Sequence, residues 1–116
     1  MIWLLAALGC GLGAQEVDSF DACATREVPL SYANFGKPFL ERHCTGCHST
    51  HLDADRRFDA PLGVDLDSFD AAVTYQSRIQ ARVLDPESPQ MPPGGGPTEL
   101  ELERLQEWLD CDLGAP

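Results

Sequence analysis

The residues best suited to chemistry lie in one short segment, Cys44-Thr45-Gly46-Cys47-His48. Two thiols three positions apart can each form a thioether to one vinyl group of the same porphyrin, and the adjacent imidazole can bind its iron. Five residues thus supply two covalent anchors and one axial ligand. The spacing predicts a c-type haem attachment site, with Cys44 and Cys47 as the attachment residues and His48 as the proximal ligand.

Two other kinds of site use a similar pair of cysteines. A thioredoxin-like redox motif lies between a strand and a helix of a βαβ unit, and the sequence contains no convincing strand. A structural zinc ion needs four ligands, usually in two spaced pairs. Here the other cysteines lie far from this pair, while His43, His48 and His51 are crowded together. Both alternatives fit the pattern less well than haem.

Met91 is the candidate for the second axial ligand, because the only other methionine is the initiator. Pro92 and Pro93 follow it, and prolines restrict the backbone, so the thioether can be held with little loss of entropy. A thioether opposite an imidazole raises the reduction potential of the iron relative to ligation by two imidazoles. His43 and His51 lie too close to His48 along the chain to reach the opposite face, and we expect both on the surface. A methionine that fills a core gap, or an open sixth site, is the alternative.

Two helices are expected around these residues. The first runs from about Ser31 into the haem motif, although Pro38 can instead mark the first turn of a later start. The second covers residues 68–84, where apolar residues recur at steps of three and four, and Asp67 or Ser68 can cap its start.

A third helix is expected near the C-terminus. Thr98 and Glu101 form a capping-box pattern at its start, and it should end within residues 110–112. Its apolar stripe comprises Leu102, Leu105, Trp108 and Leu109. Residues 49–67 and 85–97 are rich in Asp, Gly and Pro and should form loops, the first with its acidic side chains in solvent. These features together predict an all-α chain.

Length and charge restrict the possible partners. The chain has 116 residues, which suits one small domain, and a net charge of −11 from 19 acidic and 8 basic side chains. This charge argues against binding to nucleic acid or to anionic membranes. It favours a redox partner with a basic docking surface, although a generally solvated acidic surface explains it equally well.

The N-terminus predicts export. Residues 1–14 form an apolar run followed by small residues, typical of a secretory leader and too short to span a bilayer. The segment Leu8-Gly9-Cys10 also resembles the end of a bacterial lipoprotein box, which makes Cys10 a lipidation candidate. Ordinary cleavage near Gly13 or Ala14 is the alternative. Either route leads to the periplasm.

Cys23 and Cys111 remain, one near each end of the mature chain. In an oxidising compartment two such cysteines usually pair, so we expect a disulfide between them. Two buried free thiols are the alternative. Residues 15–30, which include Cys23, are expected to form an extended N-terminal arm.

Residues 31–116 resemble the monohaem class I cytochromes c. That family has a glycine eight positions before the first haem cysteine and an apolar residue four before it, and Gly36 and Leu40 match them. Its last helix carries a Leu-x-x-aromatic pair, matched by Leu105 and Trp108. The resemblance implies that the first and last helices cross closely at these four residues.

The resemblance also implies a second contact to the proximal ligand. The family has a Pro-x-Gly segment whose proline carbonyl accepts the imidazole N–H, and Pro61-Leu62-Gly63 corresponds, with Pro61 as the acceptor for His48. The implied fold has three to five helices around one covalently bound haem c. The implied role is one-electron transfer between redox proteins, not enzymatic turnover. A ligand-binding or peroxidase-type haem protein and a cytochrome subunit of a larger dehydrogenase are the alternatives.

Overall fold

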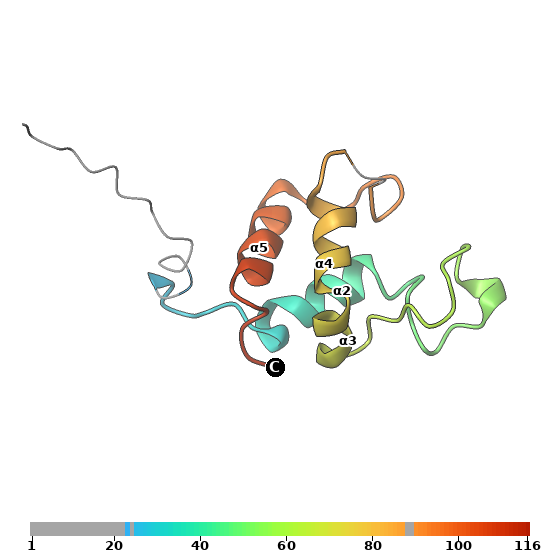
Figure 1. Ribbon diagram of the computed structural model, residues 1–116, viewed down its shortest axis with the longest axis horizontal. Coiled ribbons are helices and arrows are strands. Elements are labelled where there is room, and N and C mark those ends of the chain that lie inside the picture. Colours follow the sequence, from blue (N-terminus) through green and yellow to red (C-terminus); the bar gives the residue numbers. More distant parts are fainter. Residues whose placement is uncertain (1–22, 24, 88–89) are drawn as a thin grey trace, which may run out of the picture.

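The computed structural model describes Cys23, residues 25–87 and residues 90–116. The expected leader at 1–14, with the lipidation candidate Cys10, lies outside this part, as does most of the expected arm at 15–30. Every regular element within the described part is a helix (Figure 1), so the all-α prediction is confirmed. None of these described helices is both long and apolar enough to cross a membrane.

The first helical stretch begins at Ser31 and has two parts, the π-helix η1 (Tyr32–Gly36) and the α-helix α2 (Lys37–His43). The Ser31 hydroxyl accepts a hydrogen bond from the N–H of Asn34 at 3.1 Å, and the Asn34 side chain accepts one from the N–H of Ser31 at 2.7 Å. Pro38 lies in the first turn of α2, where a missing N–H costs little. The predicted start is confirmed, and Pro38 falls at the junction of the two parts.

The second helical stretch comprises three short elements, α3 (Phe69–Thr74), α4 (Gln76–Ile79) and the π-helix η3 (Gln80–Leu84). Ser68 caps its start, because its hydroxyl accepts from the N–H of Ala71 at 3.1 Å. The predicted extent, 68–84, is confirmed, but the helix is interrupted at Tyr75 (φ −101°, ψ 13°). The Tyr75 hydroxyl donates to the carbonyl of Gly63 at 2.9 Å, which ties this break to the preceding loop.

The last helix, α5 (Glu99–Asp110), begins and ends as predicted. The Thr98 hydroxyl accepts from the N–H of Glu101 at 3.2 Å, and the Glu101 carboxylate accepts from the N–H of Thr98 at 2.8 Å. This reciprocal pair satisfies two N–H groups that the first turn of a helix otherwise leaves free.

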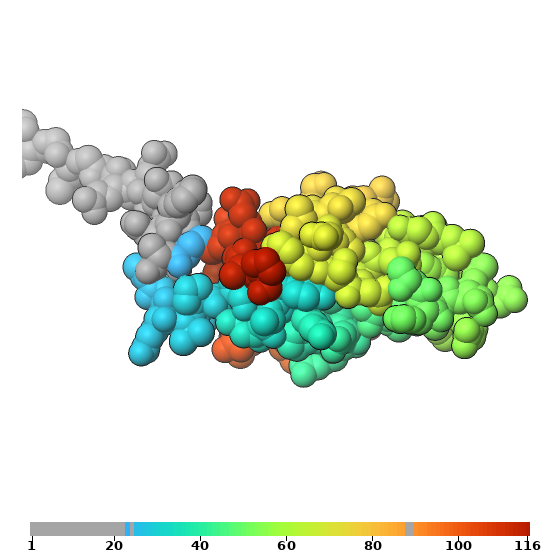
Figure 2. Space-filling view, turned by 90° about the horizontal axis from the view of Figure 1, so that it is seen from below, coloured from blue at the N-terminus to red at the C-terminus, as the bar shows by residue number. Residues whose placement is uncertain are grey.

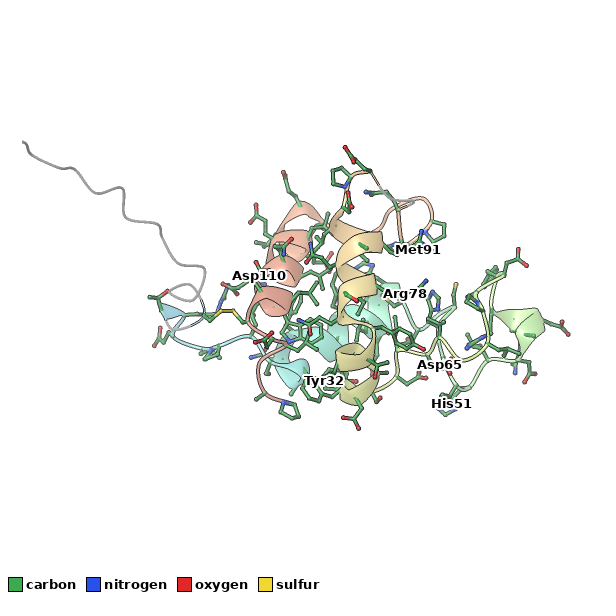
Figure 3. All side chains as sticks on the ribbon, viewed as in Figure 1. Tyr32, His51, Asp65, Arg78, Met91 and Asp110 are labelled. Carbon is green, nitrogen blue, oxygen red and sulfur yellow. A yellow bond between two sulfur atoms is a disulfide. The ribbon has the colours of Figure 1, made fainter. Side chains whose placement is uncertain are left out.

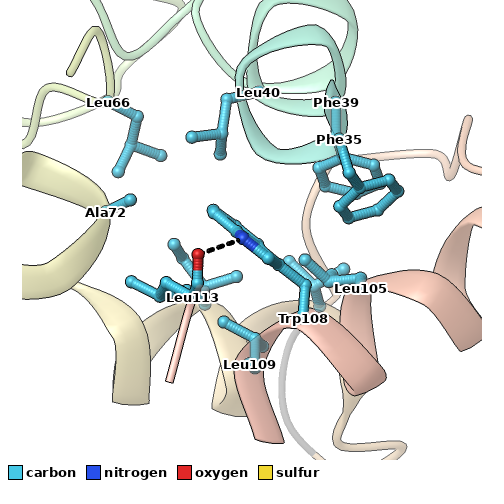
Figure 4. Close-up of a cluster of buried hydrophobic side chains, with 11 residues drawn as sticks. Phe35, Phe39, Leu40, Leu66, Ala72, Leu105, Trp108, Leu109 and Leu113 are labelled. Atoms are coloured by element: carbon cyan, nitrogen blue, oxygen red, sulfur yellow. Dashed lines mark hydrogen bonds between the residues drawn. The ribbon is translucent and has the colours of Figure 1, made fainter. Parts of the chain in front are cut away.

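The core lies where α5 crosses the first helical stretch. Trp108 is fully buried, and its Nε1–H donates to the carbonyl of Leu113 at 2.7 Å (Figure 4). A Cβ atom on Gly36 would overlap the Trp108 ring, so only glycine permits this approach. Leu40 and Leu105 are buried in the same cluster. The predicted crossing through these residues is confirmed.

The expected loops are also found. Residues 49–67 contain one short 3-10 turn, η2 (Ala54–Arg56), and are otherwise irregular. This loop extends away from the helices in Figure 1 and forms one end of the molecule in Figure 2. Residues 85–87 and 90–97 are likewise irregular.

A disulfide lies at the opposite end. Cys23 and Cys111 are bonded, with their Cα atoms 5.7 Å apart, so the predicted pairing is confirmed (Figure 3). Beside it Arg26 Nε lies 2.8 Å from a carboxylate oxygen of Glu107. The ion pair joins the N-terminal arm to α5, and the disulfide joins it to the residue that follows α5.

Candidate haem attachment site

The two candidate attachment residues lie in a tight turn directly after α2. The carbonyl of Cys44 accepts from the N–H of Cys47 at 3.1 Å and from the N–H of His48 at 2.9 Å. Cys44 and Cys47 are free thiols and both are partly exposed. One turn therefore brings together the two thiols and the imidazole that the sequence singled out.

The Cys44 thiol is unlike that of a redox-active CxxC motif. Burial against the core, with a smaller contribution from Cys47, raises the pKa of the Cys44 thiol to about 12. Dithiol oxidoreductases depend on a thiolate with a lowered pKa. Since the described part of the chain also contains no βαβ unit, the thioredoxin-like alternative loses both of its requirements.

His48 is oriented by a backbone carbonyl. Its Nδ1 lies 3.0 Å from the carbonyl oxygen of Val64, so Nδ1–H can donate there. This bond favours the tautomer in which Nε2 carries the lone pair, which is the form that binds a metal. The imidazole is half-buried. His48 therefore has the hydrogen bonding expected of a proximal ligand.

The acceptor for His48 is Val64 and not Pro61, so this expectation was wrong. Residues 61–64 form a turn in which the N–H of Val64 donates to the carbonyl of Pro61 at 3.4 Å. Gly63 has φ +88°, a conformation that favours glycine, and it redirects the chain before Val64. The Pro-x-Gly pattern located this turn correctly, but the carbonyl that meets the imidazole belongs to the residue after the glycine and not to the proline.

Further hydrogen bonds align the segment after His48 with the segment after Val64. The N–H of Leu66 donates to the carbonyl of His48 at 2.9 Å, and the N–H of Thr50 donates to the Asp67 carboxylate at 2.6 Å. The two segments are therefore held side by side over several residues.

A buried ion pair, which the sequence analysis missed, joins the same segments. The side chain of Arg57 is 1% exposed. Its Nη1 donates to the carbonyl of Ser49 at 3.1 Å and to Asp65 Oδ1 at 2.7 Å. The expectation that the acidic residues of this loop face solvent is thus wrong for Asp65, whose side chain is 22% exposed. The sequence did contain a signal for this pair, because Arg57 is a basic residue in a loop rich in aspartates.

Met91 lies in the irregular segment after η3 and is 40% exposed. Its N–H donates to the carbonyl of Arg82 at 2.8 Å, which fixes its backbone. This exposure argues against a core gap-filler. In Figure 3 Met91 and Asp65 lie on the same side of α4, away from α5.

The segment after Met91 approaches the helix that leads into the haem motif. A Cβ atom on Gly96 would lie 3.4 Å from Nδ1 of His43, the last residue of α2. His43 was expected on the surface, but its side chain is only 9% exposed, so this prediction was wrong. Nε2 of His43 lies 3.2 Å from Glu101 Oε1, and its ring centroid lies 5.0 Å from that of Phe39. His51 is exposed, as predicted.

Glu101, in the first turn of α5, connects this helix to α2 through its contacts with Arg42 and His43. The hydrogen bond from the N–H of Thr98 lowers the pKa of the Glu101 carboxyl to about 2, burial opposes this shift, and His43 and Arg42 add to it. Nε2 of His43 is therefore engaged with this carboxylate.

The donor set fits haem better than zinc. In the described ranges no three His, Cys, Asp or Glu side chains come together as metal ligands, so a zinc ion finds no ligand set there. Two free thiols and an oriented imidazole in one turn, with a partly exposed thioether on a neighbouring loop, are the donors that a covalently attached haem needs.

Comparison with known proteins identifies no relative: no protein family, curated protein or solved structure matches this chain. The functional interpretation therefore depends on the site geometry and on the motif itself.

Proposed function

We propose that this chain is a monohaem c-type cytochrome that carries one electron between larger redox proteins. The observation that carries the proposal is the turn after α2, in which two free thiols are followed by an imidazole whose Nδ1 is already engaged by Val64. Cys44 and Cys47 would hold the porphyrin through thioethers, and His48 and Met91 would bind its iron. The haem would supply the one-electron redox chemistry.

The protein itself contributes binding, orientation and exclusion of water. The carbonyl of Val64 holds the Nδ1 proton of His48 and so strengthens Nε2 as a donor. Leu40 and Phe39, both buried, lie in the core cluster against which Cys44 packs, and they keep water from that side. Electron transfer needs no general acid, general base or substrate pocket, so the proposal makes this chain a carrier and not an enzyme.

The proposal places the mature protein in the periplasm, where the haem would be attached after export. The Cys23–Cys111 disulfide supports an oxidising compartment. Cys10 is the candidate for a lipid anchor. The net charge of −11 favours a redox partner with a basic docking surface, whether the chain acts alone or as a subunit of a dehydrogenase.

The deciding experiment is production of the full chain in a bacterial host that matures c-type cytochromes. We expect a red protein whose haem survives denaturation on a gel and adds to the intact mass. Replacement of Cys44 or Cys47 by alanine should impair that attachment. A colourless protein with the mass of the polypeptide alone would overturn the proposal.

The assignment of Met91 has its own test. Met91→Ala should keep the covalent haem, lower the reduction potential and allow imidazole to bind the iron. Leu100→Ala, which removes another exposed apolar side chain outside the loops near His48, is the control and should leave both properties unchanged. A high-spin ferric spectrum in the unaltered protein would instead favour the open-site alternative.

A further inference from the structure

Arg57 is an unusual residue for a polar surface loop, because its side chain is 1% exposed. Nη1 bonds the carbonyl of Ser49 and the carboxylate of Asp65, and Nη2 also bonds Asp65. Nε is buried too, and it has no hydrogen-bond partner in the described part of the chain. Burial of a charged group is unfavourable unless its donors are all satisfied, and here one is not.

Stability alone does not account for this arrangement. A buried ion pair contributes little net stability, and apolar residues of similar volume often replace one without loss. The same loop also forms an exposed pair, in which Arg56 Nη2 lies 3.2 Å from Asp53 and the side chains are 63% and 81% exposed. We therefore look for the reason that Arg57 is buried in the positions of its two acceptors, the Ser49 carbonyl and the Asp65 carboxylate.

Each acceptor is the next residue in the chain after one partner of the hydrogen bond between His48 and Val64. Ser49 directly follows His48, and Asp65 directly follows Val64. The Arg57 guanidinium thus holds one residue beside each end of the 3.0 Å bond between His48 Nδ1 and the Val64 carbonyl. Figure 3 shows Asp65 where the loop meets the helical body.

We propose that the Arg57–Asp65 pair is a positioning group for the proximal imidazole. It fixes the length and direction of the hydrogen bond from His48 to Val64, and so sets the donor strength of His48 Nε2 and the reduction potential. Outer contacts of this kind are known to orient and tune metal-binding histidines. The inference rests on the proposed function and deepens it.

The test uses the haem-loaded protein and a double variant that leaves the net charge unchanged, Arg57→Met with Asp65→Leu. Its matched control is Arg56→Met with Asp53→Leu, which removes the exposed pair of the same loop. In the first variant we expect the His48 Nδ1 proton, followed by NMR in the ferrous protein, to exchange with solvent about tenfold faster, as loss of one ordinary hydrogen bond would give. The control should exchange at the unaltered rate.

The direction in which the reduction potential shifts in the double variant distinguishes a positioning role from other roles of the pair. A weaker Nδ1 bond makes the imidazole a poorer donor, which destabilises ferric iron and raises the potential. Simple loosening of the loop would admit water and lower the potential instead. If the pair acted only through its charges, Arg57→Met alone and Asp65→Leu alone would shift the reduction potential in opposite directions. The double variant would then have the reduction potential of the unaltered protein.

An unchanged or lowered potential in the double variant, or an unchanged exchange rate, would overturn this inference alone. If the double variant does not accumulate with haem, Arg57→Lys decides, because it keeps the charge but lacks the planar guanidinium whose Nη1 and Nη2 together hold the Asp65 carboxylate. It should shift both readouts in the same directions, and unaltered readouts would overturn the inference. A colourless wild-type protein would overturn the proposed function as well.

Discussion

The two ends of this molecule are stabilised in different ways. The crossing end comprises the contact of α5 with the first helical stretch and the Cys23–Cys111 disulfide, and at its centre Trp108 is fully buried against Gly36. The other end, called the haem end after the attachment site proposed there, comprises the Cys44–His48 turn and the loops at 49–67 and 90–97. Polar contacts predominate there, while large apolar side chains remain exposed.

Three residues make the contrast plain: Phe58 is 84% exposed, Leu62 68% and Met91 40%. The crossing end instead has a core in which large side chains such as Trp108, Leu105 and Leu40 are buried together, and this burial is the main source of folding stability. The haem end uses hydrogen bonds to place a few functional groups. Stability and site geometry should therefore respond to different substitutions.

The largest loss of stability is expected at the crossing end, from Trp108→Ala. Removal of a buried aromatic side chain typically lowers the free energy of unfolding by about 3–5 kcal/mol. The hydrogen bond to Leu113 is lost as well. Denaturant unfolding measures the change, and Leu100→Ala on the same helix, where the side chain is 55% exposed, is the control. Equal effects of the two substitutions would contradict a core centred on Trp108.

The disulfide should rank second. Its cysteines are 88 positions apart, and chain entropy gives an upper limit of about 4–5 kcal/mol for a loop of that length, with about 2–4 kcal/mol usual in practice. Cys23→Ser with Cys111→Ser should lower the free energy of unfolding by that amount and leave the absorption spectrum of the haem-loaded protein unchanged. A spectral change would mean that the two ends are not separable.

The crossing end was largely predictable because its signals are local. The capping box at Thr98 and the aromatic residue at Trp108 are each recognisable within a few positions. Gly36 was informative only through a known family pattern, but its physical reason, contact with an indole ring, is simple. The pairing of Cys23 with Cys111 followed from counting cysteines.

The haem end was predictable only in its motif. Which carbonyl meets His48, and which acid meets Arg57, depends on the path of an irregular loop, and no periodic pattern reports that path. His43 was misplaced because its burial depends on Glu101, more than fifty positions later, being held by its own helix cap. The interruption at Tyr75 likewise arises from a contact with Gly63 outside the helix.

A smaller, pH-dependent effect is expected where the two ends meet, from Glu101→Gln. Glutamine can still cap α5, but the charged contacts with Arg42 and His43 are lost, and about 1 kcal/mol of stability at neutral pH is the upper end of the usual cost of losing partly exposed ion pairs. The folded pKa of Glu101, about 2, lies below its ordinary value of 4.5, so its stabilisation is fully present above pH 4.5. It is lost as the pH falls toward 2.

The free energies of unfolding of Glu101→Gln and of the unaltered protein should therefore differ at pH 7 and become equal as the pH approaches 2. Glu99→Gln, which removes a charge from the same turn of α5, controls for the helix dipole. A gap between Glu101→Gln and the unaltered protein that stayed constant down to pH 2 would refute the assigned pKa shift.

The smallest effect, and the one of opposite sign, is expected from Phe58→Asn in the loop at 49–67. Phe58 has φ 51°, a left-handed conformation that asparagine adopts more readily than an aromatic residue. Its ring is 84% exposed, so little buried area is lost. We expect a gain of about 0.5 kcal/mol or less in the free energy of unfolding.

Phe39→Asn makes the same chemical change at a phenylalanine that is 3% exposed and should be strongly destabilising, because it opens a cavity and buries an amide. The two substitutions, compared by denaturant unfolding, place the same exchange at each end of the molecule. If Phe58→Asn instead cost more than about 1 kcal/mol, a value typical of buried sites, its ring would have to belong to a packed core. The haem end would then be stabilised in the same way as the crossing end, and the distinction between a folding end and a positioning end would fail.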